Sequence, residues 1–567
     1  MRFQQYNPTL KRLAVGVLTV VITAMPLAAR TVQAAPPRAS GEYLTAIQNA
    51  ASTFTRNFNP FAAVARRDFT DGAIYEPLMV MTTAGGGHTY PWLATKYAWA
   101  NHNKTVIVTL RKGVRWSDGK PFTAKDVAFT FNYGKRYAAA DETGLMQSGQ
   151  ISSVKALNTY QVAFHLGAVN TTILPTLLST NVMIVPQHIW SKIHNPATYA
   201  NAHPVGTGPF TQVTAFSSQE YTLGKNPYYW QNVGYAGIKV PALPSNDAII
   251  AALVSHHLDW VGVSISNIQS TFLNRDPAHN HAFTDKIQPL ALEFNDQKYP
   301  FSLPVLRKAL SLAINRQQIY KIAESGNEPP ADALGMKLLF PKWVNPAVQK
   351  QATALAKYDP SKAESMLKAA GFTYNGSQLV DPKGNPVSFT LQVPADWNDW
   401  DTAMQILVNN FKAIGVDASF QGMDDNSFFD QRSKRLLNPA YFQAGPGPDP
   451  YDFFYYYMSK QTYFPAGTAA PGGSGNLEGW YSAKATSLLN QYRKTASSKL
   501  KHKIIVQLEK IQVSQLPIIP TVYQAAWFEN VTSKFTGFPT KKDNYAIGSP
   551  YQYPDDLKIL TNLKPVK

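Results

Sequence analysis

Four acidic residues are the first side chains in this 567-residue chain that could do chemistry together. Asp424, Asp425, Asp449 and Asp452 could supply the carboxyl pair of a glycosidase, whose two acids lie about 5–10 Å apart across the bond that is cut. The tripeptide at 448–450 (PDP) predicts a rigid loop instead, in which the Asp449 carboxylate accepts backbone N–H bonds. A glycosidase is therefore the more distant alternative, and no catalytic residue is predicted.

Two histidine groups, His256-His257 and 279–281 (HNH), could ligate a metal. Neighbouring side chains of a strand point to opposite faces, and no acidic residue stands at a useful spacing, so surface or loop positions are predicted. The chain lacks the motifs of zinc proteases, serine hydrolases, Walker loops and dinucleotide sites. The GTGP stretch at 206–209 predicts a tight turn, because its proline offers no N–H to a phosphate. No metal or cofactor is predicted.

Aromatic residues beside acids and amides are the stronger signal, since they suit sugar rings or mixed peptide side chains. The stretch 396–401 (DWNDWD) places Trp397, Asn398 and Trp400 at the start of a predicted helix. A second aromatic run occupies 451–457 (YDFFYYY), and most of its rings are expected in the core. The candidate ligand contacts are Trp397, Trp400, Asn398, Asp449, Tyr441, Trp480, Trp527 and Asn57.

Helices and strands must position these residues, and the stretch 109–131 illustrates the sequence patterns that predict them. Residues 105–110 (TVIVTL) are typical of a strand, and Asp118-Gly119 is typical of a turn. Thr123 with Asp126 three residues later forms a capping-box pattern that predicts a helix start. The whole stretch is therefore predicted to be a strand, a tight turn and a capped helix.

Other helices are predicted at Val305–Ala323, after Asp359-Pro360 as far as Gly371, from Met404 to Gly415, and around Leu500–Ile511. Each has an apolar stripe suited to lie on a sheet. The alternation of short strands with such helices predicts α/β layers.

The first 34 residues are predicted to be a signal peptide. Arg2, Lys11 and Arg12 precede an apolar run over 13–25, and residues 32–34 (VQA) fit a cut after Ala34. We therefore expect the mature chain to be soluble and exported. The chain contains no cysteine, which excludes disulfides, thiol catalysis and a lipid attached to an N-terminal Cys, so no lipidation is expected.

Length and charge set the remaining limits. A chain of 567 residues predicts two or three domains. The formal net charge is +17, but Lys and Arg are dispersed and no nucleic-acid motif occurs, so no nucleic-acid partner is predicted. A basic surface that faces an anionic envelope is the favoured interpretation.

Several stretches, in order along the chain, resemble extracellular solute-binding protein family 5, the receptors of peptide- and oligosaccharide-type ABC importers. The similar stretches are NFNPF and IYEPL (57–78), LRKGVRWSDGKPFTAKDVAFTF (110–131), VGTGPF (205–210), KNPYYW (225–230), VLRKALSLAINR (305–316), YDPSKAESMLKAAGF (358–372) and LPIIPTVY (516–523). In this family the stretch at 110–131 belongs to a structural corner. The resemblance thus agrees with the capped strand–turn–helix prediction.

The resemblance implies a two-lobe α/β fold of the periplasmic-binding-protein type (type II, cluster C), with an inserted domain and a hinge. Lobe I is expected to comprise 35–80, 205–289 and 526–567, the inserted domain 81–204, and lobe II 290–525. A ligand would bind between the lobes, and the expected partner is a membrane permease. A monomer at the periplasmic or outer face of the cell envelope is expected.

The ligand class is inferred from two further comparisons with the family. Peptide receptors commonly place an Asp just upstream of the Asp-Pro pair to hold the α-ammonium, whereas this chain has Gly445, Pro446 and Gly447 there. A buried ammonium without a charge partner is costly. Residues 394–416 and 535–565 are similar to the β-oligosaccharide-binding branch. An oligosaccharide of the cello- or xylo-oligomer type is therefore the preferred ligand, with a peptide receptor as the alternative.

Overall fold

The computed structural model describes residues 41–62, 69–395, 397–444, 447, 449–468 and 475–566. Within these ranges a four-stranded sheet of order β1-β10-β9-β8 forms the centre of lobe I. Its strands are β1 (Tyr43–Thr45), β8 (Phe210–Phe216), β9 (Glu220–Lys225) and β10 (Gly237–Pro241). Around it lie α5 (Asn246–Val254), α6 (Ile268–Thr271), η3 (Leu273–Arg275), α16 (Asp555–Asn562) and the short pair β19 (Phe535–Thr536) and β20 (Lys564–Pro565).

A second four-stranded sheet, of order β4-β5-β7-β6, lies within residues 81–204. Its strands are β4 (Ala94–Ala100), β5 (Thr105–Leu110), β6 (Ile151–Asn158) and β7 (Gln161–Leu166). β2 (Met79–Thr82) leads into this range, and the remaining elements within it are η1 (Ala84–Gly86), β3 (His88–Pro91), α2 (Ala124–Arg136), η2 (Ala138–Ala140), α3 (Leu174–Leu178) and α4 (Gln187–Trp190).

The stretch 109–131 forms the structural corner that the sequence predicts. Helix α2 begins after Thr123, and Thr123 and Asp126 form the capping box. The Arg111 Nε atom donates to the Trp92 carbonyl at 2.7 Å, and the guanidinium lies 3.9 Å from the centre of the Trp230 ring. The basic residue of this motif therefore holds two parts of the fold together.

The glycines of the GTGP stretch are required by a close backbone approach. A Cβ atom at Gly206 would lie 1.9 Å from the Ile74 carbonyl oxygen, and one at Gly208 would lie 2.2 Å from that of Ala73. No side chain fits at either position without moving the backbone, so the stretch serves packing.

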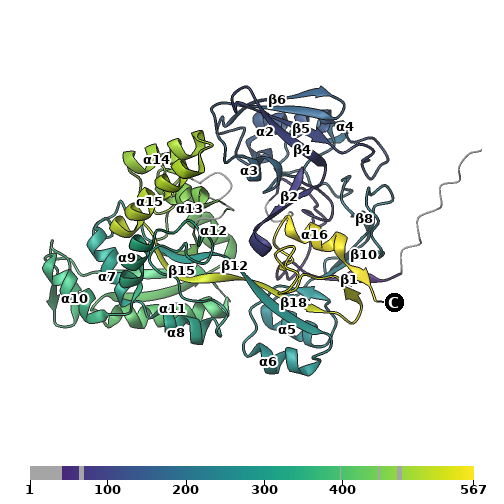
Figure 1. Ribbon diagram of the computed structural model, residues 1–567. Coiled ribbons are helices and arrows are strands. Elements are labelled where there is room, and N and C mark those ends of the chain that lie inside the picture. Colours follow the sequence, from purple (N-terminus) through teal and green to yellow (C-terminus); the bar gives the residue numbers. More distant parts are fainter. Residues whose placement is uncertain are drawn as a thin grey trace, which may run out of the picture. The chain divides into compact units, whose positions relative to one another are not determined.

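The third sheet has six strands in the order β11-β18-β12-β17-β15-β16. Two of them are unusually long, β12 (Asn280–Glu293) and β18 (Ile519–Val531), and they pair antiparallel over most of their length (Figure 1). At one end β18 pairs with β11 (Trp260–Val261) of lobe I, and at the other β12 pairs with β17 (Ala440–Gln443) of lobe II. These two strands therefore connect the two lobes.

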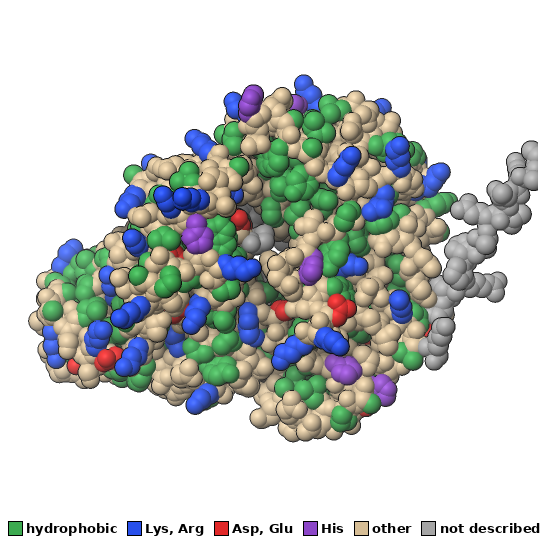
Figure 2. Space-filling view, viewed as in Figure 1, with side chains coloured by type: hydrophobic (Ala, Val, Ile, Leu, Met, Phe, Trp, Pro, Cys, Tyr) green, Lys and Arg blue, Asp and Glu red, His purple; other side chains and the backbone are tan. Residues whose placement is uncertain are grey.

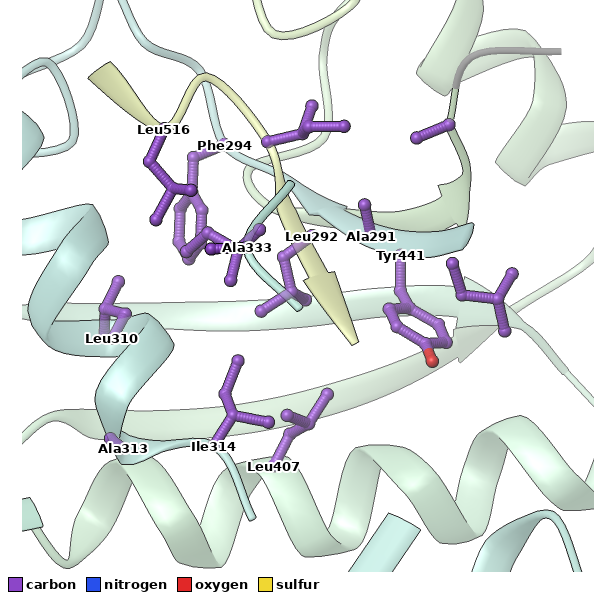
Figure 3. Packing of buried hydrophobic residues seen from close by; sticks show 14 of the residues in the cluster. Ala291, Leu292, Phe294, Leu310, Ala313, Ile314, Ala333, Leu407, Tyr441 and Leu516 are labelled. Atoms are coloured by element: carbon purple, nitrogen blue, oxygen red, sulfur yellow. The ribbon is translucent and has the colours of Figure 1, made fainter. Parts of the chain in front are cut away.

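Lobe II completes this sheet with β15 (Ser388–Pro394) and β16 (Asp417–Met423) and covers it with helices. The helices and the small hairpin are α7 (Pro304–Ala313), α8 (Arg316–Gln318), η4 (Ile319–Ala323), α9 (Pro346–Ala356), α10 (Pro360–Ala369), β13 (Thr373–Asn375), β14 (Gln378–Val380), α11 (Asn398–Lys412), α12 (Asp425–Ser433), α13 (Pro450–Met458), η5 (Lys460–Thr462), α14 (Ala483–Lys494) and α15 (Ser498–Gln515). Figure 3 shows Leu292, Leu310, Leu407 and Tyr441 among the buried side chains of the lobe II core.

The helix predicted over Val305–Ala323 is wrong in its length. Helix α7 ends at Ala313, because Ile314 is extended and the Asn315 N–H donates to the Asn410 side-chain oxygen at 2.7 Å. The Asn315 side chain then caps the next turn. The helices predicted after Asp359, from Met404 and around Leu500 are confirmed as α10, α11 and α15.

Buried side chains gather into three large clusters, centred on residues 290–522, on the four-stranded sheet of lobe I, and on residues 78–184. The mixed α/β class predicted from the sequence is confirmed by this architecture. We propose the domain boundaries stated above, although the lobe I cluster also takes in Tyr133, Met183 and Trp190 of the inserted domain. No helix in the described part of the chain is long and apolar enough to cross a membrane.

Candidate functional site

A hollow of about 220 Å³ opens on lobe II beside the end of β12. It is built where β17 lies next to β12 and where α12 and α13 approach the same end of the sheet. Its lining residues are Glu293, Arg432, Phe442, Gln443, Ala444, Tyr456, Tyr457, Gly475, Leu477, Glu478 and Ile518.

An ion pair forms one wall of the hollow. The Arg432 Nε and Nη2 atoms donate to the two carboxylate oxygens of Glu293 at 2.8 and 2.7 Å, which is a bidentate arrangement. The same guanidinium lies 4.1 Å from the centre of the Phe442 ring. Glu293 is therefore neutralised by its partner and offers no free negative charge to a ligand.

Two buried polar groups also line the hollow. The Glu478 side chain is only 1% exposed, and burial, with the Glu293 charge next in effect, raises its pKa well above the usual range. Its Oε1 atom and the Tyr457 hydroxyl have no hydrogen-bond partner among the described residues. Leaving such groups unsatisfied costs about 1–3 kcal/mol each. Because both atoms are buried, a bound hydroxyl or amide would recover that cost only if the side chains around the hollow moved to admit it.

An aromatic cluster adjoins the hollow. The Trp397 and Trp400 rings meet edge to face with centroids 4.7 Å apart, and Trp400 packs in the same way on Tyr441 and Phe442 at 5.2 and 5.7 Å. Trp400 and Tyr441 are buried, whereas Trp397 is half-buried. Of these predicted contacts, Trp397 thus keeps an indole surface that a ligand could cover.

Asp449 lies close to this region and has a structural partner. Its carboxylate caps α13 by accepting the Tyr451 N–H, and it also accepts the Tyr492 hydroxyl, both at 2.8 Å. The predicted loop Asp that accepts backbone N–H bonds is therefore confirmed. Trp480 is half-buried two residues beyond Glu478, and its carbonyl accepts a short hydrogen bond from Asn476.

The other three predicted contacts lie elsewhere. Asn398 is exposed at the first turn of α11. The Asn57 side chain accepts the Asn59 N–H at 3.0 Å in a turn of lobe I. Trp527, 7% exposed, lines a different hollow of about 510 Å³ beside α6. A ligand role for each predicted residue stays a prediction, and Asp396, Gly445 and Pro446 lie outside the described residues.

Sequence reasoning missed Glu293, Arg432 and Glu478. Glu293 had a usable signal, because it is the lone charge in an apolar strand segment, PLALEF at 289–294. Arg432 and Glu478 stand in polar surroundings that resemble many surface segments. Only their position around the hollow marks them.

The inserted domain and lobe II also touch away from the connecting strands. The Thr171 N–H donates to the Arg493 carbonyl at 2.7 Å, and the Thr171 hydroxyl donates to the Thr495 carbonyl at 3.2 Å. Both acceptors lie at the end of α14, where helical carbonyls lack partners in their own helix. This contact bridges the two parts in the structure described here.

The chain is similar to known proteins over most of its length. The family model for bacterial extracellular solute-binding proteins, family 5 (middle) matches residues 88–465. The nickel-binding periplasmic protein of Escherichia coli K12 is 25% identical over 410 residues, covering 70% of this chain and 74% of the relative. The dipeptide-binding protein DppE of Bacillus subtilis is 23% identical over 464 residues, covering 78% and 80%.

The fold also matches a solved structure. The mannohexaose-bound periplasmic oligopeptide-binding protein of Thermotoga maritima superposes with a TM-score of 0.79 at 23% identity, covering 93% of this chain and 99% of that one. The two-lobe fold expected from the sequence is confirmed by this similarity.

Proposed function

Because the chain belongs to family 5 of the bacterial extracellular solute-binding proteins, we propose that it is the substrate-binding component of an ABC importer. Its partners would be the permease subunits of that importer and a small-molecule ligand. The two strands β12 and β18 support this proposal, since a pair of connecting strands can act as a hinge between lobes. Ligand capture then depends on tighter binding to the closed form than to the open form.

We propose further that the ligand is a neutral oligosaccharide of the cello- or xylo-oligomer type and that the lobe II hollow contacts it. The observation that carries this proposal is the ion pair of Glu293 with Arg432, which balances the carboxylate charge in the wall of the hollow. Burial also raises the pKa of Glu478 well above its usual range, which favours its uncharged form. Such a hollow offers hydrogen bonds and aromatic faces to sugar hydroxyls and rings, but no charge partner to an α-ammonium group.

An oligopeptide is the second candidate. The Bacillus subtilis relative is named as a dipeptide-binding protein, and the Thermotoga maritima relative as an oligopeptide-binding protein although its structure holds mannohexaose. A peptide amide could also satisfy the Tyr457 hydroxyl and the Glu478 carboxyl. We therefore treat the ligand as the point to be measured first.

The test is a titration calorimetry panel of cello-, xylo- and manno-oligosaccharides and of mixed tri- to nonapeptides. We expect saturable binding of a sugar, weakened about tenfold by Trp397→Ala, which corresponds to ~1.4 kcal/mol. Trp343→Ala is the matched control, because that half-buried indole stacks on His502 and, unlike Trp397, is not packed on Trp400 in the aromatic cluster that adjoins the hollow. Binding of peptides without binding of any sugar would overturn the ligand class and leave the receptor role intact.

We also propose that the protein acts outside the cytoplasm, at the periplasmic or outer face of the envelope. The predicted signal peptide at 1–34 supports this, and those residues lie outside the described part of the chain. Fractionation of cells that produce the full chain, with mass determination of the secreted form, tests both the export and the cut after Ala34.

A further inference from the structure

One surface of lobe II is formed by a stretch of the chain that contains several basic residues and no acidic residue. Between Glu478 and Glu509 the chain contains no Asp or Glu. The basic residues in this interval, which we call the basic face, are Lys484, Arg493, Lys494, Lys499, Lys501 and Lys503. They belong to α14 and α15.

The cations of the basic face are available to a partner. Lys484, Lys494, Lys499 and Lys503 are exposed. Within the described residues, the ion pairs closer than 4.0 Å involve other cations, and none of them includes a member of the basic face. Lys501 contacts the Tyr492 ring instead, at 4.8 Å. The four exposed lysines therefore have no carboxylate partner within 4.0 Å among the described residues.

The position of these charges on α15 opposes helix stability. The helix has 18 residues, and its first turns contain Lys499, Lys501 and Lys503 with no acid in the first turn. The positive end of the helix dipole lies at the N-terminus, so cations there are destabilising, whereas the Arg493 and Lys494 side chains at the end of α14 are favourably placed. The N-terminus of α15 and the basic side chains at both helix ends thus present positive charge at one surface, which favours an anionic partner.

Apolar side chains accompany the cations. A shallow hollow of about 740 Å³ lies over α15, and it is lined by Leu488, Leu500, Ile504 and Val506 together with Lys499 and Lys503. Leu500 is 41% exposed. Figure 2 shows Lys and Arg side chains and a histidine gathered over α14 and α15, with apolar side chains between them.

We propose that the basic face binds the anionic headgroups of a phospholipid bilayer. Cations beside exposed Leu side chains match the two layers of such a surface, since phosphates meet the lysines and the glycerol region meets the apolar groups. Each Lys near an anionic bilayer raises binding by roughly fivefold at low salt. This attachment would keep the protein at a membrane surface, and it does not depend on the identity of the ligand.

The test is co-sedimentation of the full chain with vesicles of phosphatidylcholine alone or with about 30% phosphatidylglycerol. We expect binding only to the anionic vesicles, and release in about 0.5 M NaCl, because salt shortens the range of the attraction. The triple variant Lys494→Gln, Lys499→Gln, Lys503→Gln should lose at least tenfold in partition. The control triple variant Lys357→Gln, Lys362→Gln, Lys412→Gln removes the same charge from exposed positions elsewhere on lobe II and should stay within about threefold of the wild type.

Three results would overturn the proposal: no binding of the wild type to anionic vesicles, equal losses in both triple variants, or binding that survives high salt. Capture by a soluble polyanion such as polyphosphate, with no vesicle binding, would assign the face to a different partner and also overturn it. A melting temperature close to that of the wild type shows that the test variant is folded. Loss of Lys499 and Lys503 relieves repulsion at the start of α15, whereas loss of Lys494 removes a favourable charge at the end of α14.

Discussion

Replacement of Arg432 by Met tests the ion pair on which the proposed neutral hollow depends. The side chains of Arg432 and Glu293 are 11% and 7% exposed, so the substitution leaves a buried carboxylate without its cation. Breaking a buried pair in this way costs about 3–5 kcal/mol, and the lost contact with Phe442 adds about 0.5–1 kcal/mol. Because water reaches part of the hollow, we expect the lower end, about 3 kcal/mol from the free energy of unfolding of lobe II.

The double variant Glu293→Gln with Arg432→Met removes both charges, and we expect it to lose no more than about 1.5 kcal/mol. Urea unfolding of the wild type, both single variants and the double variant gives the coupling free energy of the pair. Tryptophan fluorescence is a suitable probe, since Trp400 packs on Phe442 beside Arg432. If Arg432→Met cost no more than the double variant, the pair would contribute nothing and the argument for a neutralised Glu293 would fail.

Three further results are expected. Burial raises the pKa of Glu76 from 4.5 to about 7. As the pH rises from 4.5 to 7, the unfolded chain therefore loses this proton before the native state does. The free energy of unfolding falls by ~3 kcal/mol over that range. Glu76→Gln should therefore gain about that much over the wild type between pH 4 and pH 8, and a pH-independent difference in unfolding free energy would refute this. Thr171→Ala should weaken the contact with Thr495 by ~1 kcal/mol, and we expect a longer mean distance between dyes placed on the inserted domain and on lobe II. The control is Thr172→Ala, because the Thr172 hydroxyl bonds within its own loop. An equal change in distance in both variants would count against the prediction. Gly206→Ala should lower the melting temperature by several degrees, because its Cβ would meet the Ile74 carbonyl, and an unchanged melting curve would contradict that geometry.

Local sequence patterns were sufficient to predict the ends of helices where the interacting residues are near one another in the chain. The capping box of α2 joins residues three positions apart, and the cap of α10 joins Asp359 to Lys362. Both were predictable, because a helix end is set by the few backbone groups that lack partners in the helix. The helix predicted over Val305–Ala323 failed for the complementary reason, since Asn410, 95 residues away, binds the N–H at which the helix breaks.

The candidate site was only partly predictable. The stretch 396–401 drew attention to two indoles, but it could not tell which of them is buried. Trp400 is 2% exposed because it packs on Tyr441 and Phe442, while Trp397 retains an accessible surface. Periodicity identifies a helix face, whereas the exposure of one ring depends on what the rest of the chain places against it.

The sequence by itself determined the family, the α/β class and the ends of several helices, because ordered motifs and local hydrogen bonds are properties of neighbouring residues. The tertiary structure decided the site. It paired Glu293 with Arg432 across 139 residues, buried Glu478 beside them, and gathered the basic face from two helices. Charge pairing, burial and the pKa values that follow depend on distances through space, and the packing of the whole chain sets those distances.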